Sequence, residues 1–126
     1  MRLTPKQNDD FHVACQKLND GGTLELRRSS TVAFLPERQP PGTPVTICGA
    51  PWCDACHIAA DYMKQYGIPY VELDIEQDEV AKAKCESVLD RAGFGKKIKA
   101  LPVLDVRGTI LVGFSPCALE AAWAAP

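Results

Sequence analysis

The sequence predicts an α/β domain in which helices flank a mixed four-stranded sheet, preceded by an N-terminal helix and hairpin. From residue 44 onward, short apolar runs alternate with segments of helical periodicity, a pattern that favours parallel strands joined by crossover helices. Near the end of the chain, two further apolar runs are separated only by Arg107-Gly108, which is typical of a hairpin. A parallel pair together with a hairpin makes a mixed sheet.

The elements of this domain follow in a regular order. Val45 to Cys48 forms a short apolar strand, and a turn then leads into a helix that we expect from Cys53 to about Tyr66. Gly67 and Pro69 end this helix, because neither residue type continues a helix readily. The remaining elements are a strand over 70–75, a helix over 78–91, hairpin strands over 102–106 and 109–113, and a helix over 116–123.

Residues 1–43 read as an extension ahead of a domain that covers residues 44–126. Apolar residues at helical spacing predict a first helix, with a cap at Asn8 or Asp9 and an end at Gly21-Gly22. The runs 23–27 and 31–35 form a probable hairpin, and the prolines that follow make a linker.

Composition excludes several classes of protein. The 126 residues are 46% hydrophobic and 24% charged, with a formal net charge of −2, so a disordered chain is excluded and nucleic acid is not expected as a partner. No run approaches the roughly 20 apolar residues of a membrane span, so no membrane partner is expected. The polar first residues lack a secretory pattern, which predicts a cytoplasmic protein with reduced thiols.

Only two of the six cysteines are close in sequence, and these two are the candidates for chemistry. Cys15, Cys48 and Cys117 are expected to pack as small hydrophobic residues. Cys85 stands among charged residues and is expected to be an exposed, passive thiol, with a second redox or regulatory role as the alternative. The chain is therefore expected to be a reduced protein with one working pair. The six are Cys15, Cys48, Cys53, Cys56, Cys85 and Cys117.

Cys53 and Cys56 stand where a strand leads into the first turn of a helix. Free amide groups and the helix dipole at such a position favour a thiolate, which is the form that attacks disulfides. Cys53 is therefore the predicted nucleophile, and Cys56, one turn further on, is the predicted resolving thiol. Asp54 should oppose thiolate formation, and a protonated His57 should favour it.

The domain resembles the glutaredoxin branch of the thioredoxin superfamily over about two-thirds of the chain. The resemblance implies a thioredoxin-like fold and thiol–disulfide oxidoreductase activity on protein or glutathione mixed disulfides. It also implies that Pro102 is a cis-proline facing the dithiol, and that substrate contacts come from Trp52, Leu101, Pro102, Gly113 and Phe114. The segments that carry it are Val45-Thr46-Ile47-Cys48-Gly49-Ala50-Pro51-Trp52-Cys53-Asp54-Ala55-Cys56, Gly67 to Ile75, Leu101 to Leu104, and Gly108 to Phe114.

The sequence departs from glutaredoxins that use glutathione at two places. No lysine precedes Cys53 in the strand and turn, and Val112-Gly113-Phe114-Ser115 stands where that family has Gly-Gly-x-Asp. The chain is thus closer to small redoxins that serve ribonucleotide reductase and take electrons from thioredoxin reductase. No bound cofactor is expected, and the reductant is either glutathione or an enzyme of the thioredoxin-reductase type. Lys96, Lys97 and Lys99 could supply positive charge near the site.

Three other readings of the motif remain open. The domain could be a binding or redox-sensing module without turnover. Cys53, Cys56 and His57 could bind zinc together with Cys48 or Cys85, although adjacent Cys56 and His57 rarely share one ion. Cys-x-x-Cys-His also fits covalent haem attachment, with Met63 as a second iron ligand.

Overall fold

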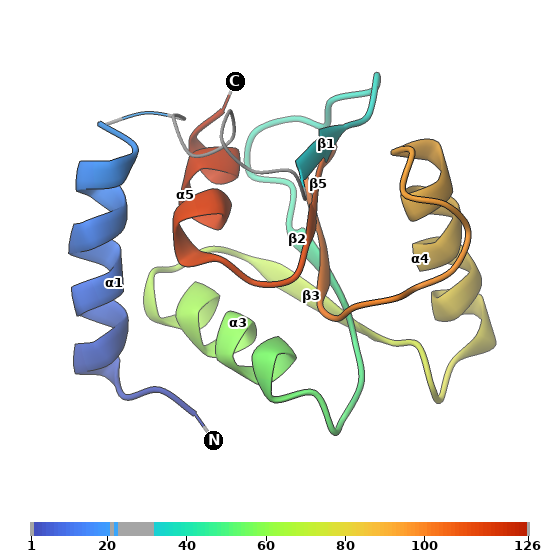
Figure 1. Cartoon of the computed structure of the whole chain (residues 1–126), viewed down its shortest axis with the longest axis horizontal. Coiled ribbons are helices and arrows are strands. Elements are labelled where there is room, and N and C mark those ends of the chain that lie inside the picture. The colour runs from blue at the N-terminus through green and yellow to red at the C-terminus, as the bar shows by residue number, and fades with distance from the viewer. Residues whose placement is uncertain (1, 21, 23–31, 126) are drawn as a thin grey trace.

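The computed structural model describes residues 2–20, 22 and 32–125. A five-stranded sheet lies between helices, with α3 and α5 on one face, α4 on the other, and α1 outside α5 (Figure 1). The elements are α1 (Pro5–Leu18), β1 (Val32–Phe34), β2 (Val45–Gly49), α3 (Asp54–Gln65), β3 (Tyr70–Asp74), α4 (Glu79–Arg91), β4 (Val103–Val106), β5 (Thr109–Val112) and α5 (Pro116–Ala124).

The sheet is mixed, as the sequence predicts, and its strand order is β1-β5-β4-β2-β3. The pair β2–β3 is parallel and is connected through α3, whereas β2–β4 and β4–β5 are antiparallel. The β4–β5 turn is formed by Arg107 and Gly108, both with positive φ. The register pairs Gly49 with Asp74, which places the end of β2 beside the end of β3. The predicted α/β architecture is confirmed.

The fifth strand is a correction to the predicted four-stranded sheet. β1 comes from the N-terminal extension and pairs antiparallel with β5, with Ala33 opposite Ile110. Without it, β5 would present unpaired backbone groups at the edge of the sheet. The other predicted strand of the N-terminal hairpin, over 23–27, lies outside the described residues.

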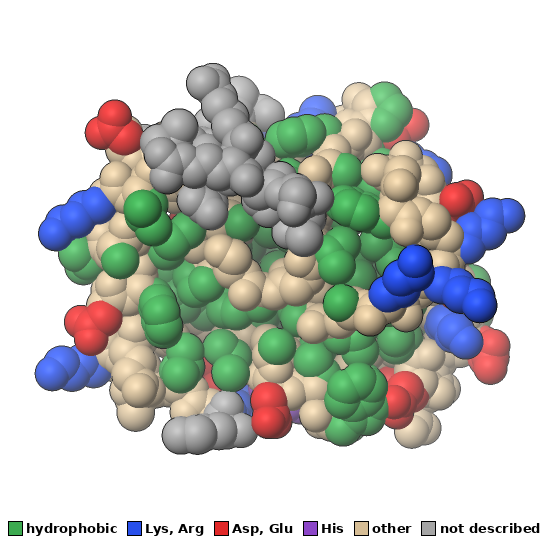
Figure 2. Space-filling model, in the orientation of Figure 1, with side chains coloured by type: hydrophobic (Ala, Val, Ile, Leu, Met, Phe, Trp, Pro, Cys, Tyr) green, Lys and Arg blue, Asp and Glu red, His purple; other side chains and the backbone are tan. Residues whose placement is uncertain are grey.

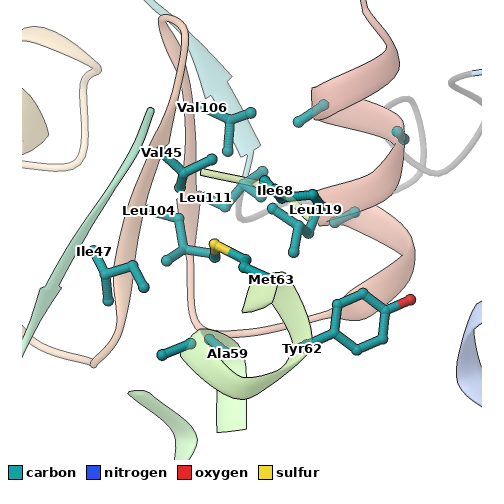
Figure 3. Packing of buried hydrophobic residues seen from close by; sticks show 14 residues of the cluster. Val45, Ile47, Ala59, Tyr62, Met63, Ile68, Leu104, Val106, Leu111 and Leu119 are labelled. Carbon is teal, nitrogen blue, oxygen red and sulfur yellow. The ribbon is translucent and has the colours of Figure 1, made fainter. Parts of the chain in front are cut away.

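Apolar side chains form one cluster on each face of the sheet. Figure 3 shows the larger cluster, in which Met63 and Ala59 of α3 lie below Leu104 and Leu111 of the sheet, and Leu119 of α5 closes the side. The cluster on the other face contains Cys48, Cys85 and Leu89 under α4. The two helices that follow β2 and β3 are thereby fixed on opposite faces.

The first helix begins earlier than the predicted cap at Asn8 or Asp9. Thr4 is the N-cap, and Pro5 occupies the first helical position. The Thr4 hydroxyl accepts the Gln7 amide N–H at 3.2 Å, and the Gln7 side chain accepts the Thr4 amide N–H at 2.8 Å. This capping box satisfies two backbone donors, and the capping at Asn8 or Asp9 expected from sequence is therefore wrong.

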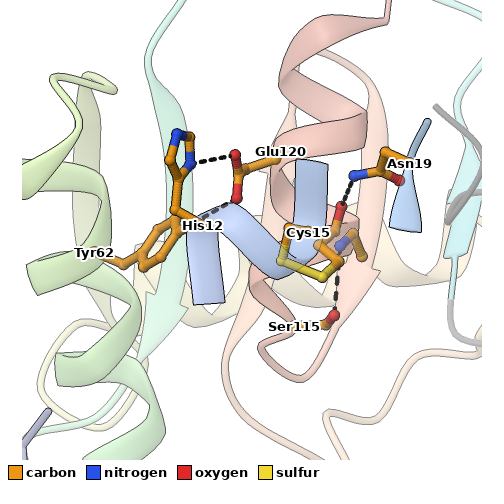
Figure 4. The surroundings of a disulfide bond; sticks show 8 residues. His12, Cys15, Asn19, Tyr62, Ser115 and Glu120 are labelled. Atoms are coloured by element: carbon orange, nitrogen blue, oxygen red, sulfur yellow. Dashed lines mark hydrogen bonds and ion pairs between the residues drawn. A yellow bond between two sulfur atoms is a disulfide. The ribbon is translucent and has the colours of Figure 1, made fainter. Parts of the chain in front are cut away.

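α1 is attached to the domain by a disulfide and by polar contacts. Of its described residues only Asn8 and Cys15 are buried, whereas Phe11 and Leu18 are exposed. Cys15 is bonded to Cys117 of α5, and Figure 4 shows the surrounding interactions. His12 Nδ1 lies 2.6 Å from Glu120 Oε1, and Glu120 also accepts the hydroxyl of Tyr62 on α3. Helices α1, α3 and α5 therefore meet at one carboxylate.

All six cysteines are in disulfides, which corrects the expectation of one working pair in a reduced protein. Cys15, Cys48 and Cys117 are not free packing thiols, because Cys15 pairs with Cys117 and Cys48 pairs with Cys85. Cys85 is only 1% exposed, so the expectation of an exposed passive thiol is also wrong. Ala81, Cys85 and Leu89 form the buried stripe of α4 at a four-residue spacing, which turns Cys85 towards the sheet.

Charged side chains of both signs are spread over the face in Figure 2, and Lys and Arg side chains gather beside α4. None of the described helices is both long and apolar enough to cross a membrane.

Replacing Cys15 and Cys117 together by serine should loosen α1. Loss of a disulfide typically costs about 2–4 kcal/mol of the free energy of unfolding. We expect the α1 amides to exchange hydrogen faster relative to the β4 amides, because polar contacts and the stacking of the His12 ring on Tyr66 are then left to hold the helix. The matched control, in which Cys48 and Cys85 are replaced by serine, should leave this ratio unchanged. Unchanged α1 exchange in the first variant would contradict the anchoring role of Cys15–Cys117.

We expect the ionisation of Tyr66 to lower the free energy of unfolding at high pH. Burial and the hydrogen bond to the Asp9 carboxylate raise the pKa of Tyr66 to about 12 from its ordinary value of 10.0. Between these values the unfolded chain ionises first, so the free energy of unfolding should fall as pH rises. With the disulfides kept oxidised, urea unfolding at about pH 9 and about pH 11 should show a smaller fall for Tyr66→Phe than for the parent. An equal fall would refute this assignment.

Candidate functional site

The candidate site lies where β2 leads into α3. Cys53 is the N-cap of α3, and its Sγ accepts the Cys56 amide N–H at 3.2 Å. The Cys53 amide donates to the Ala50 carbonyl at 3.1 Å, which closes the turn between strand and helix. The Cys53 sulfur thus takes the place of a capping oxygen at the positive end of the helix dipole.

The structure joins Cys53 and Cys56 in a disulfide with a Cα–Cα separation of 5.3 Å. Cys53 is 5% exposed and Cys56 is 3% exposed, so little of either residue reaches the surface. Ala50 packs with both cysteines, and Leu101 and Ala55 cover the same small cluster. One predicted substrate residue, Leu101, is therefore in this cluster with the disulfide.

Pro102 precedes β4 and lies beside Gly113, which follows β5. The Leu101–Pro102 peptide bond is cis, as the resemblance implies, and Pro102 is fully buried. Its carbonyl accepts the Gly113 amide N–H at 2.8 Å, which ties the start of β4 to the end of β5. Phe114, by contrast, packs edge-on against Tyr62 at a ring-centroid separation of 5.9 Å. Phe114 therefore belongs in part to the core beside α3 and α5.

Trp52 projects from the turn beside the disulfide. Its side chain remains 66% exposed even though its indole N–H donates to Glu76. Glu76 is held in turn, because its amide N–H donates to the Asp74 side chain at 2.9 Å. The contact links the turn after β2 to the turn after β3 and fixes an exposed aromatic ring next to Cys53.

A cavity of about 340 Å³ opens beside Cys56. None of the predicted substrate residues lines it, and the residues from β3 were not identified from the sequence. The parallel pairing of Gly49 with Asp74 explains their presence, because it brings the end of β3 alongside the turn. The lining residues are Ile47, Gly49, Ala50, Pro51, Cys56, His57, Glu72, Leu73 and Asp74.

His57 lines this cavity with a defined orientation. Its Nε2 lies 2.8 Å from the Pro51 carbonyl oxygen, which can only accept a hydrogen bond. Nε2 therefore carries a proton, and in the neutral ring Nδ1 is left as the acceptor. Two acidic residues, Glu72 and Asp74, line the same cavity from β3.

The structure separates residues that the zinc and haem hypotheses would bring together. Cys48 and Cys85 are bonded to each other beneath α4, on the face of the sheet opposite α3, so they do not join Cys53, Cys56 and His57 around one ion. Among the described residues, no group of three His, Cys, Asp or Glu side chains is placed to hold a metal. Met63, the second iron ligand in the haem hypothesis, is fully buried in the core.

Comparison with known proteins identifies the family of the chain. The chain matches the Glutaredoxin family over residues 45–111, more than half its length. It is 24% identical over 76 residues to an uncharacterized glutaredoxin-like 8.6 kDa protein in the rubredoxin operon of Clostridium pasteurianum, covering 60% of this chain and 92% of that protein. No solved structure matches significantly. With the mixed sheet, the cis-proline and the disulfide at the start of α3, this protein belongs to the glutaredoxin family.

Proposed function

We propose that this protein is a thiol–disulfide oxidoreductase that uses Cys53 and Cys56. The observation that carries the proposal is the bonded cysteine pair at the N-terminus of α3, with the Cys53 sulfur accepting a helix amide. An amide donor and the helix dipole stabilise a thiolate at that sulfur once the pair is reduced. Membership of the glutaredoxin family supports the same chemistry.

The exchange proceeds in two displacements. The Cys53 thiolate attacks one sulfur of a substrate disulfide, forms a mixed disulfide, and releases the other half of the substrate as a thiolate that takes up a proton. The Cys56 thiolate then attacks Cys53 Sγ, which forms the intramolecular disulfide and releases the second substrate thiolate. Two electrons pass from the protein to the substrate, and an external reductant returns them.

Protein disulfides are the proposed substrates. The exposed ring of Trp52 offers a flat apolar surface beside Cys53, and aromatic side chains of this kind are favoured at protein interfaces. Leu101 packs with the disulfide. Pro102 follows Leu101 in the sequence, and the Gly113 amide N–H donates to the Pro102 carbonyl. We assign Trp52, Leu101 and Gly113 to substrate contact, and the buried Pro102 to positioning the adjacent Leu101. Phe114 would serve as support, because its ring packs on Tyr62.

The electron donor is proposed to be an enzyme of the thioredoxin-reductase type, with glutathione as the alternative. Glu72 and Asp74 line the cavity next to Cys56, and Asp54 begins α3 next to Cys53. These carboxylates disfavour an anionic tripeptide at that side of the pair. Exposed lysines on the connection between α4 and β4 would favour binding of the anionic tripeptide; these are Lys96, Lys97 and Lys99.

Turnover tests the proposal in an NADPH-coupled assay with a protein disulfide such as insulin. One arm contains thioredoxin reductase, and the other contains glutathione and glutathione reductase. Cys53→Ser should lower the rate by at least about a hundredfold in whichever arm is active, because the nucleophile is lost. Cys56→Ser should instead accumulate a mixed disulfide through Cys53, detected by mass spectrometry.

The matched control replaces Cys48 and Cys85 by serine and should retain most of the rate. An unchanged rate for Cys53→Ser would refute the catalytic assignment. Binding of disulfide-containing proteins without turnover in either arm would identify a binding or sensing module instead.

Asp54 should moderate the reactivity of Cys53. Asp54→Asn removes the negative charge of the residue that follows Cys53, so the thiolate fraction of reduced Cys53 should rise. We expect iodoacetamide to label Cys53 roughly threefold faster at mildly acid pH, in line with a charge effect below about 1 kcal/mol at a helix end. Asp61→Asn, further along the same helix, is the control. A slower or unchanged rate for Asp54→Asn would contradict the electrostatic argument.

A further inference from the structure

The end of β2 passes so close to Cys56 that position 49 has room only for a glycine. A Cβ atom at Gly49 would lie 2.9 Å from Cys56 Sγ and 3.1 Å from Cys56 Cβ. Gly49 is not among the glycines with positive φ, so its backbone conformation does not demand a glycine. The steric contact with Cys56 is therefore what distinguishes this position from an ordinary strand residue.

The two contacts of that Cβ differ in how they depend on the redox state. In the disulfide, Cys56 Sγ is bonded to Cys53 Sγ, and the Cys53 sulfur is itself held by the amide N–H of Cys56. After reduction, Cys56 Sγ is free to move to another staggered rotamer. The contact with Cys56 Cβ exists in both states, because α3 fixes the backbone. A side chain at position 49 would thus oppose the disulfide more than the dithiol.

We propose that Gly49 is a positioning residue that sets the balance between the disulfide and the dithiol of Cys53 and Cys56. The absence of a side chain lets Cys56 Sγ occupy the place that the disulfide needs. Any larger residue would shift the equilibrium towards the dithiol and make the oxidised pair a stronger oxidant. The inference deepens the proposed thiol–disulfide exchange, on which its functional meaning rests.

The equilibrium with dithiothreitol measures this balance directly. The oxidised pair and dithiothreitol give the Cys53 and Cys56 dithiol and cyclic oxidised dithiothreitol, with two electrons and two protons passing to the protein. After equilibration and acid quenching, differential alkylation followed by peptide mass spectrometry gives the reduced fraction of each cysteine pair in the full chain. The Cys53–Cys56 pair is thereby read separately from the other two.

Gly49→Ala should shift this equilibrium about tenfold towards the dithiol, which corresponds to about 30 mV for a two-electron couple. Gly22→Ala is the matched control, because among the described residues a Cβ there would meet the Asn19 carbonyl oxygen alone, at 3.8 Å. The Cys15–Cys117 and Cys48–Cys85 pairs serve as internal references and should keep their reduced fractions. An unchanged Cys53–Cys56 equilibrium, or an equal shift of the internal references, would overturn the proposal.

A second measurement separates the contact with Sγ from general damage to folding. The loss of unfolding free energy caused by Gly49→Ala is compared in the oxidised parent and in a Cys56→Ala background, as a double-mutant cycle. The loss should be smaller in the background, which lacks the sulfur, and equal losses would refute the mechanism. Neither measurement needs turnover. If Gly49→Ala shifts the Cys53–Cys56 equilibrium in a protein without turnover, the proposed function is refuted and this inference is supported.

Discussion

The pleat of β2 is the constraint on which the rest of the structure depends. Alternate residues of a strand face opposite sides of a sheet, so Val45, Ile47 and Gly49 face α3 while Cys48 faces α4. The first set forms the floor under α3 and ends in the glycine beside Cys56. Cys48 forms the bond that holds α4. A shift of one residue in the register of β2 would exchange these roles and destroy both arrangements.

The sequence was most informative where one local rule decided the outcome. The hairpin at Arg107-Gly108, the helices after β2 and β3, and the cis-proline followed from turn chemistry, periodicity and resemblance. The place of the fifth strand in the sheet could not be predicted, because nothing in the run Val32 to Phe34 indicates that it pairs with β5. The start of α1 was misplaced because the cap was sought just before the apolar residue Phe11, whereas the capping box of Thr4 and Gln7 lies one turn earlier.

The cysteine pairing was missed for a related reason. Cys15 and Cys117 are separated by 102 residues, and only the packing of α1 on α5 brings them together. Cys85 was judged by its charged sequence neighbours, whereas its place on the helix is set by Ala81 and Leu89. The cavity residues Glu72 and Asp74 belong to the same category, since they reach Cys56 only through the parallel pairing of β3 with β2. Long-range contacts thus carried the information that local patterns lack.

The Cys15–Cys117 bond has a mechanical consequence. It closes a covalent ring that contains the whole sheet, and the other two disulfides lie within that ring. A force that pulls on the two chain ends therefore travels through α1, the bond and α5, and bypasses β2 and α3. Only the residues before Cys15 and after Cys117 can be drawn out while the bond is intact. A molecule pulled by its two ends would keep the fold around Cys53 and Cys56 intact until the Cys15–Cys117 bond is reduced.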